Sequence, residues 1–172
     1  RSNEAKCKSI YKIIKNGVPR NIFSICQSAF YDFNTLRSIN AENVKFIQGF
    51  AFDNCLSLQK ASFPNVKYFG NSCFHNCFNL QILNAPICAE LGSSCFENCR
   101  SLTKFNCKPE TLPNGVFNRC QFTFLNLNSV KSVERYAFCF CNVKQLIIEN
   151  CEQIDDDAFY MTLNKVDVKC AC

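Results

Sequence analysis

The chain repeats itself every 21 or 22 residues, and this period constrains the fold more than any other feature of the sequence. A small residue followed by Phe recurs seven times, and successive phenylalanines are separated by 22, 22, 22, 21, 21 and 21 residues. We call these phenylalanines the anchors; they are Phe30, Phe52, Phe74, Phe96, Phe117, Phe138 and Phe159. A period of this length is typical of a solenoid, in which each repeat forms one coil and stacks on the next.

A short apolar phrase follows each anchor and predicts a strand. Its pattern is apolar-x-x-apolar-x-apolar, as in "LQKASF" from Leu58 and "LQILNA" from Leu80. The other copies read "LRSINA", "LTKFNC", "FTFLNL", "VKQLII" and, from Leu163, "LNKVDV". The end of the phrase alternates at period two, which indicates one buried and one outward face. Stacked about 4.8 Å apart, such strands form a parallel sheet in which each sequence position becomes a column of equivalent residues.

The frame resembles the BspA-type leucine-rich repeat, whose signature runs roughly L-x-x-I-x-L-P-x-x-V-x-x-I-G-x-x-A-F-x-x-C. The stretch "PNVKYFGNSCFHNC" carries the Pro, Val, Gly, Phe and Cys of that signature in order, although the glycine is kept only at Gly70 and Gly92. The resemblance implies a leucine-rich-repeat right-handed superhelix with a parallel β-sheet on the concave face. Short turns, 3-10 segments or strand segments would form the convex face. The later repeats are one residue shorter between Cys and strand, so we expect a changed curvature toward the C-terminus.

These patterns divide the chain into three parts. Residues 1–12 are predicted to be an N-terminal cap or leader. Residues 13–168 are predicted to contain a half-repeat, "IIKNGVP" from Ile13, and then about seven full repeats. Residues 169–172 are predicted to be a C-terminal tail.

Fifteen cysteines in 172 residues raise the question of disulfides, and the repeat frame assigns ten of them to columns that hold small apolar residues. Such positions predict buried free thiols, which pack like other small apolar side chains. The ten are Cys55, Cys77, Cys99, Cys120 and Cys141 in the signature Cys column, together with Cys73, Cys95, Cys88, Cys151 and Cys107. The other five are Cys7, Cys26, Cys139, Cys170 and Cys172, and a disulfide that caps either end is an open alternative.

The only histidine, His75, stands between two cysteines in "CFHNC" and invites a zinc or a nucleophile interpretation. Structural zinc needs four converging ligands, and this pair would supply too few. Because His75 shares a column with Asp53, Glu97, Asn118 and Tyr160, we expect it to face solvent, with its neighbouring thiols pointing inward. No catalytic motif is visible, and Asp155–157 lack the spacing of a calcium loop. We therefore expect no enzyme, no metal and no cofactor.

The net charge of +5 is spread along the chain, which does not favour nucleic acid, and no apolar run is long enough to insert into a membrane. Binding is instead expected on the outward face of the predicted sheet, at the third and fifth residues of each strand phrase. The candidate residues are Lys60, Ile82, Asn84, Lys104, Asn106, Phe124, Asn126, Ile147 and Lys165. The lysines favour an acidic partner, the asparagines can hydrogen-bond along their column, and the apolar three are candidate hot spots.

The family resemblance implies a cell-surface or secreted protein that adheres to host or matrix proteins through its concave face. An intracellular scaffold for protein–protein interactions is the alternative, and free thiols and the lack of an N-x-S/T site favour it. A purely structural segment of a longer surface chain is a third possibility. Exposed apolar ends could also support end-to-end self-association.

Overall fold

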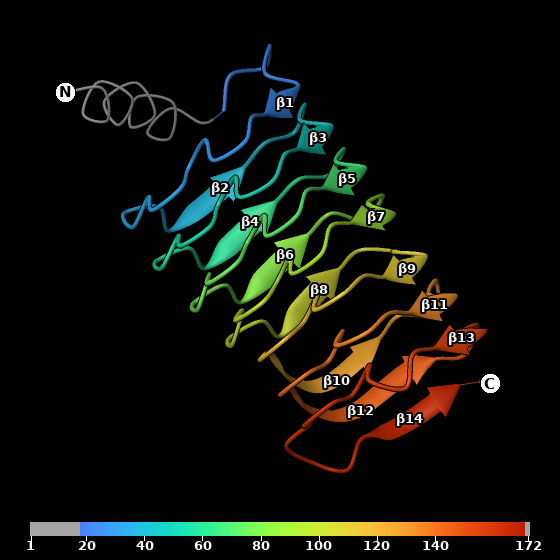
Figure 1. Cartoon of the computed structure of the whole chain (residues 1–172). Coiled ribbons are helices and arrows are strands. Elements are labelled where there is room, and N and C mark those ends of the chain that lie inside the picture. The colour runs from blue at the N-terminus through green and yellow to red at the C-terminus, as the bar shows by residue number, and fades with distance from the viewer. Residues whose placement is uncertain (1–17, 171–172) are drawn as a thin grey trace.

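The computed structural model describes residues 18–170 as a parallel β-solenoid of seven coils (Figure 1). Each coil contributes one strand to a front sheet and one to a back sheet. The front strands are β2 (Ser38–Asn40), β4 (Lys60–Ser62), β6 (Ile82–Asn84), β8 (Lys104–Asn106), β10 (Gln121–Asn126), β12 (Asn142–Ile148) and β14 (Asp167–Cys170). The back strands are β1 (Ser24–Ile25), β3 (Phe46–Ile47), β5 (Tyr68–Phe69), β7 (Glu90–Leu91), β9 (Thr111–Leu112), β11 (Ser132–Val133) and β13 (Gln153–Ile154). The predicted residues 1–12 and most of the predicted half-repeat lie outside the described residues.

All strand pairs are parallel, and all but β12 with β14 join residues of the same predicted column. Lys60 pairs with Ile82, which in turn pairs with Lys104. On the back sheet Phe46 pairs with Tyr68 in the same way. The solenoid is thus confirmed, and adjacent coils lie one strand spacing apart.

The anchors stack at the centre of the coils and form the spine of the core. The rings of Phe52 and Phe74 lie 5.1 Å apart with an interplanar angle of 4°, and the spine is continuous from Phe30 to Phe159. Every anchor from Phe52 to Phe138 is fully buried, whereas Phe159 at the C-terminal end is only partly so. Apolar contact between like residues in a column is therefore the main source of cohesion between coils.

Tight turns around each anchor form a third line of contact between coils. Residues two positions after the anchor adopt a left-handed conformation, with φ of 58° at both Asn54 and Asn76 and 62° at Asn98. Asn tolerates this conformation better than most residues. Main-chain N–H groups in the turn donate to carbonyls of the next coil, for example Phe52 to Cys73 at 2.8 Å.

Both sheets are interrupted between the fourth and fifth coils, at a junction that we call the seam. The front sheet divides into β2-β4-β6-β8 and β10-β12-β14, and the back sheet divides between β7 and β9. The main-chain bonds that cross the seam lie in the turns, where Phe96 N–H donates to Val116 O at 2.9 Å, and just before the back strands, where Lys108 N–H donates to Cys88 O at 2.9 Å. The stacking of Phe96 on Phe117 is also looser, at 5.9 Å and 21°.

Local sequence explains the seam. Gly92 N–H donates to Phe69 O at 2.8 Å, but Pro113 occupies the same column in the next coil and has no N–H to donate. In addition, Cys120 leads directly into β10, so the front strands grow from three residues in the first four coils to six and seven in β10 and β12. The shorter later repeats therefore change the front sheet where the change in curvature was expected.

The last repeat differs from its predicted register by two residues. Gln145 pairs with Asp167, whereas the phrase "LNKVDV" had placed Lys165 opposite it. The spacing from the anchor to the third column of the strand returns to eight residues at Asp167, as in the first four coils, after seven at Phe124 and Gln145. Lys165 consequently precedes β14, and the strand extends to Cys170, beyond the end predicted for the repeats at residue 168.

Candidate binding face

The front sheet presents the third and fifth residues of each strand phrase outward, and we call this surface the front face. Its third column alternates charge and apolar surface, because Ile82 lies between Lys60 and Lys104 in adjacent strands. Both lysines are exposed, and Ile82 is partly buried between them. The arrangement gives an apolar strip flanked by two cations.

The predicted asparagine column forms only in the first part of the sheet. Asn106 Nδ2 donates to Asn84 Oδ1 at 2.7 Å, and Asn84 Nδ2 donates to Ser62 Oγ at 3.4 Å. Across the seam the chain of bonds stops, since Asn126 Oδ1 accepts instead from the main-chain N–H of Asn128. The column is therefore divided at the same place as the sheet.

Of the three apolar residues predicted on this face, Phe124 is the most exposed, at 50%. It lies in β10 opposite Gln145 of β12. Ile82 and Ile147 are only half-buried and serve partly as packing residues. Phe124 is thus the candidate apolar anchor for a partner.

Sequence reasoning missed that the second residue of the strand phrase is also exposed, beside the third, and we include this column in the front face. In β10 both Thr123 and Phe124 are exposed, and Lys144 is exposed at the equivalent place in β12. Arg37 occupies this column in the first coil. The pattern apolar-x-x-apolar could have revealed this column. Its two apolar residues are buried, so both variable positions between them can face solvent.

The front face carries unpaired positive charge. Its second, third and fifth columns hold five cations and one acid, namely Arg37, Lys60, Lys104, Lys144, Lys169 and Asp167. The ion pairs found within residues 18–170 lie elsewhere: His75–Asp53 in the turns, Lys131–Glu110 on the back sheet and Arg135–Asp157 near the C-terminal end. Cations on the front face are thus free to meet an acidic partner. Lys165, which was predicted to belong to this set, is exposed in the segment before β14.

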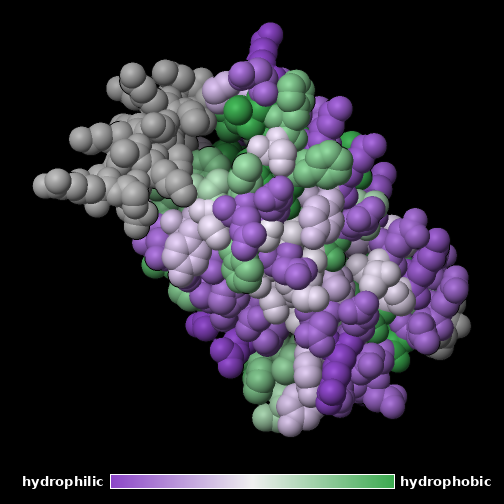
Figure 2. Space-filling view, turned by 45° about the horizontal axis from the view of Figure 1, so that its top comes forward, coloured by the Kyte–Doolittle hydropathy of each residue, from purple (hydrophilic) through white to green (hydrophobic). Residues whose placement is uncertain are grey.

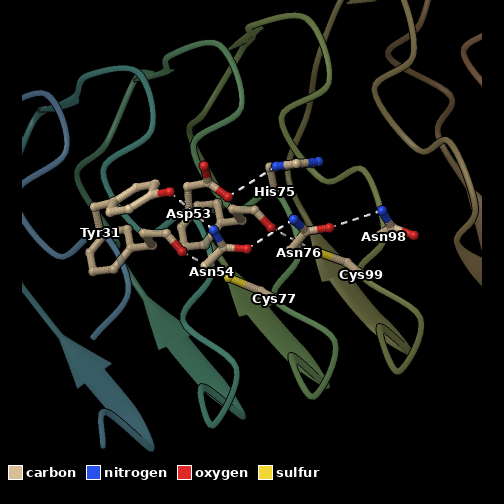
Figure 3. A network of polar contacts seen from close by, with 10 residues as sticks. Tyr31, Asp53, Asn54, His75, Asn76, Cys77, Asn98 and Cys99 are labelled. Carbon is tan, nitrogen blue, oxygen red and sulfur yellow. Dashed lines mark hydrogen bonds and ion pairs between the residues drawn. The ribbon is translucent and has the colours of Figure 1, made fainter. Parts of the chain in front are cut away.

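His75 occupies a different environment from the one predicted. Its Nδ1 lies 3.0 Å from Asp53 Oδ1, and Asp53 is only 6% exposed (Figure 3). The expectation that this column faces solvent is therefore wrong at Asp53, because the turns of adjacent coils pack closely enough to cover its carboxylate. Burial raises the pKa of the Asp53 carboxyl, and the hydrogen bond and charge of His75 lower it less.

A chain of side-chain hydrogen bonds runs beside this pair through four coils. Asn98 Nδ2 donates to Asn76 Oδ1, and Asn76 Nδ2 donates to Asn54 Oδ1, both at 2.9 Å (Figure 3). Asn54 Nδ2 in turn donates to the hydroxyl of Tyr31. At the other end Arg100 Nη2 donates to Asn98 Oδ1 at 3.1 Å, so the chain ends in a cation beside the seam.

All ten cysteines that the repeat frame placed in apolar columns are buried, and Cys139 is buried as well. The twelve cysteines from Cys26 to Cys151 are all free thiols. Burial raises the pKa of Cys55 and of Cys141 to about 12, and it raises the pKa of Cys77, Cys99 and Cys120 well above the usual value. These thiols stay protonated at neutral pH and are poor nucleophiles. The capping disulfides left open by the sequence would involve Cys7 at one end and Cys170 or Cys172 at the other, and Cys7 and Cys172 lie outside the described residues.

A metal site at the acidic run Asp155–157 finds little support in residues 18–170. Asp155 Oδ1 accepts from the N–H of Asp157, whose carboxylate pairs with Arg135, so the acidic run forms a self-contained turn. No cluster of three His, Cys, Asp or Glu side chains in this part of the chain could hold a metal ion. The same part contains no helix with the length and apolar character needed to span a membrane.

Comparison with known proteins identifies the same repeat. The sequence profile of the BspA type leucine-rich repeat region matches residues 4–123 and 110–170, with six copies. The chain belongs to this family. No curated protein matches the BspA-type chain.

Two solved structures resemble the BspA-type solenoid in fold. A leucine rich cell surface protein from Faecalibacterium prausnitzii A2-165 has a TM-score of 0.58 at 18% identity, over 90% of this chain and 53% of its own. The T. pallidum leucine rich repeat protein has a TM-score of 0.55 at 17% identity, over 89% of this chain and 71% of its own. The BspA-type chain thus spans about half the length of the first of these relatives.

Proposed function

We propose that this chain is a non-enzymatic protein-binding module that acts in adhesion or host interaction and binds through the front face. Leucine-rich repeat families offer an extended concave sheet to their partners, and we assign that role to the front sheet. The partner is an acidic protein, and neither nucleic acid nor a membrane interior is its target.

The observation that carries the proposal is the joint presence of unpaired cations and one exposed aromatic residue on the front face. Lys60, Lys104 and Lys144 have no acidic partner, and Phe124 lies on the same sheet at half exposure. Aromatic residues surrounded by polar ones commonly form the centre of an interface, while charges at its rim steer the encounter. The ion pairs found among the described residues lie in the turns and beside the back sheet instead.

A cell-surface or secreted location fits the family and the description of the F. prausnitzii relative as a cell surface protein. Antibody staining of intact and permeabilised source cells tests this location. Signal on intact cells is expected. Signal that requires permeabilisation favours the alternative, an intracellular scaffold, which the free buried thiols also suit.

The binding face is tested with a matched pair of double variants. Lys104→Gln with Phe124→Ser alters the front face, and Lys67→Gln with Phe46→Ser alters the back sheet, where Phe46 is 48% exposed. Binding of the labelled chain to intact cells and to purified acidic matrix proteins is then compared. We expect the front variant to lose binding and the back variant to keep it; the reverse result would reject the front face.

End-to-end self-association remains part of the proposal. Polar residues cover most of the surface in Figure 2, and apolar residues gather at the end where the chain enters its first coil. Val18, Ile22 and Ile25 line a hollow of about 190 Å³ there, and Met161 and Leu163 are exposed in the last coil. Sedimentation of the full chain over a range of concentrations tests this, and a monomer at all concentrations would exclude it.

A further inference from the structure

The seam opens a polar hollow on the front side of the solenoid. Its volume is about 210 Å³, too small for a typical drug-sized ligand but large enough for the end of one side chain. Three coils line it: Arg100 and Thr103 from the fourth, Gln121, Phe122 and Thr123 from the fifth, and Asn142 and Lys144 from the sixth. No acidic residue is among them.

Main-chain groups at this place lack the partners that they have in the earlier coils. Lys104 N–H donates to Gln81 O at 3.0 Å, and Ala85 N–H donates to Asn106 O at 2.8 Å. The equivalent bonds from Phe124 N–H to Thr103 O and from Cys107 N–H to Asn126 O are not formed. The edge of β10 that faces β8 therefore carries one N–H donor, that of Phe124, and one carbonyl acceptor, that of Asn126, without main-chain partners across the seam. Such groups require another partner.

Two cations, Arg100 and Lys144, line the hollow. Arg100 lies above the ring of Phe78 and uses Nη2 to reach Asn98, which fixes the guanidinium in place. A guanidinium has five N–H donors, so most of them remain free for a ligand. Lys144 is exposed and forms no ion pair. Fixed donors, an adjacent ammonium group and the absence of acids together favour an oxyanion over a cation or a neutral group.

We propose that the seam hollow is a carboxylate subsite, which receives one Asp or Glu side chain of the acidic partner while an adjacent apolar residue of that partner packs on Phe124. Thr123 lines the hollow and Phe124 is the next residue, so the polar and the apolar contact lie side by side. This inference rests on the proposed front-face function and specifies where on that face the partner's acid binds. It also explains how the break in the sheet could serve recognition.

The test is a titration of the full ¹⁵N-labelled chain with a capped hexaglutamate peptide, followed by amide NMR. The amides of Thr123 and Phe124 are expected to shift most. Lys144→Gln is expected to weaken binding about fivefold, as for the loss of one partly exposed charged pair. Arg100→Gln should weaken it at least as much, and because it also removes the bond to Asn98, its melting temperature is measured alongside.

The control is Lys60→Gln, which removes a front-face cation three coils from the centre of the hollow and should change the affinity much less. If Lys144→Gln binds as the unaltered chain does while Lys60→Gln and Lys104→Gln lose binding, the subsite is wrong and the front face survives. If no front-face amide shifts, both proposals fail. Sodium sulfate is titrated in parallel at constant ionic strength. Saturation of the same amides by sulfate at lower concentration than by the peptide would assign the hollow to a free anion and overturn the carboxylate assignment.

Discussion

The thiol of Cys99 donates a hydrogen bond to the main-chain carbonyl of Phe74, 3.2 Å away and one coil earlier. The same carbonyl also accepts from the N–H of Cys77 at 3.1 Å, so both of its lone pairs are used. The contact occurs five times in all, from Cys55 to Phe30 at one end to Cys141 to Phe117 at the other. The signature Cys is therefore more than a small apolar residue, because its proton joins each anchor to the next coil.

Replacing a signature Cys should destabilise more than replacing the other buried Cys of the same coil. Cys77→Ala removes the bond to Phe52 O, and it should lower the free energy of unfolding by about 1–2 kcal/mol. Cys73→Ala introduces the residue that Ala51 and Ala137 already supply in that column, so it should cost less. Urea unfolding of the two variants decides the matter, and equal losses would show that the thiol bond contributes nothing.

The stability lost when an anchor phenylalanine is truncated should depend on its place in the stack. Phe74→Ala, with an anchor ring stacked on each side, should cost roughly 3–5 kcal/mol, as for other fully buried phenylalanines. Phe159→Ala should cost less, since Phe159 stacks only on Phe138 and is partly exposed. Thermal unfolding of both variants measures the difference. Equal shifts in melting temperature would contradict a linear stack.

Close approach of coils makes Gly92 difficult to replace. A Cβ at Gly92 would lie 2.3 Å from Asn71 N and 2.5 Å from Gly70 C, and neither main-chain atom can move without separating two coils. We expect Gly92→Ala to lower the free energy of unfolding by about 3 kcal/mol. At Gly49 the nearest atom to such a Cβ is Asn71 O at 3.1 Å, so Gly49→Ala is the milder control. Comparable losses in the two variants would contradict this account of the stacking distance.

The pair Asp53–His75 predicts a specific pH dependence. Because burial raises the pKa of Asp53 above 3.8 in the folded state, the folded chain binds this proton more tightly than the unfolded chain. The resulting stabilisation is absent at neutral pH and grows as the pH falls through the folded pKa toward 3.8. Wild type should therefore gain stability relative to Asp53→Asn as the pH falls from 7 to 4. Urea unfolding at several pH values tests this, with Asp156→Asn in an exposed turn as control. A constant or opposite difference would refute it.

Much of the solenoid could be predicted because the columns repeat. The spacing of the anchors placed the buried thiols correctly, from Cys55 to Cys151, since every coil samples the same environment. Register failed only in the last repeat, where the alternating end of the strand pattern fits Val166 and Val168 or, two residues later, Val168 and Cys170. A period-two pattern cannot distinguish these positions when neither face of the strand is deeply buried.

The seam and the environment of His75 could not be predicted in this way, because both depend on contacts between unlike coils. Pro113 interrupts the back sheet because Leu91 O, in the preceding coil, would otherwise accept a hydrogen bond from the N–H at this position. Asp53 is buried because the turn that carries His75 packs against it. Alignment of columns reveals what equivalent residues share, and it does not reveal how one coil compensates for a change in the next.

The most direct test of the account is to count free thiols in protein from its native source. The chain is alkylated before and after unfolding, without reductant, and its intact mass is measured. We expect Cys26, which is exposed, to react in the folded chain, and the buried thiols, ten of them in the apolar columns, to react only after unfolding. If unfolded protein takes up almost no label, the columns are cross-linked by disulfides, and the ladder of thiol hydrogen bonds between coils is wrong.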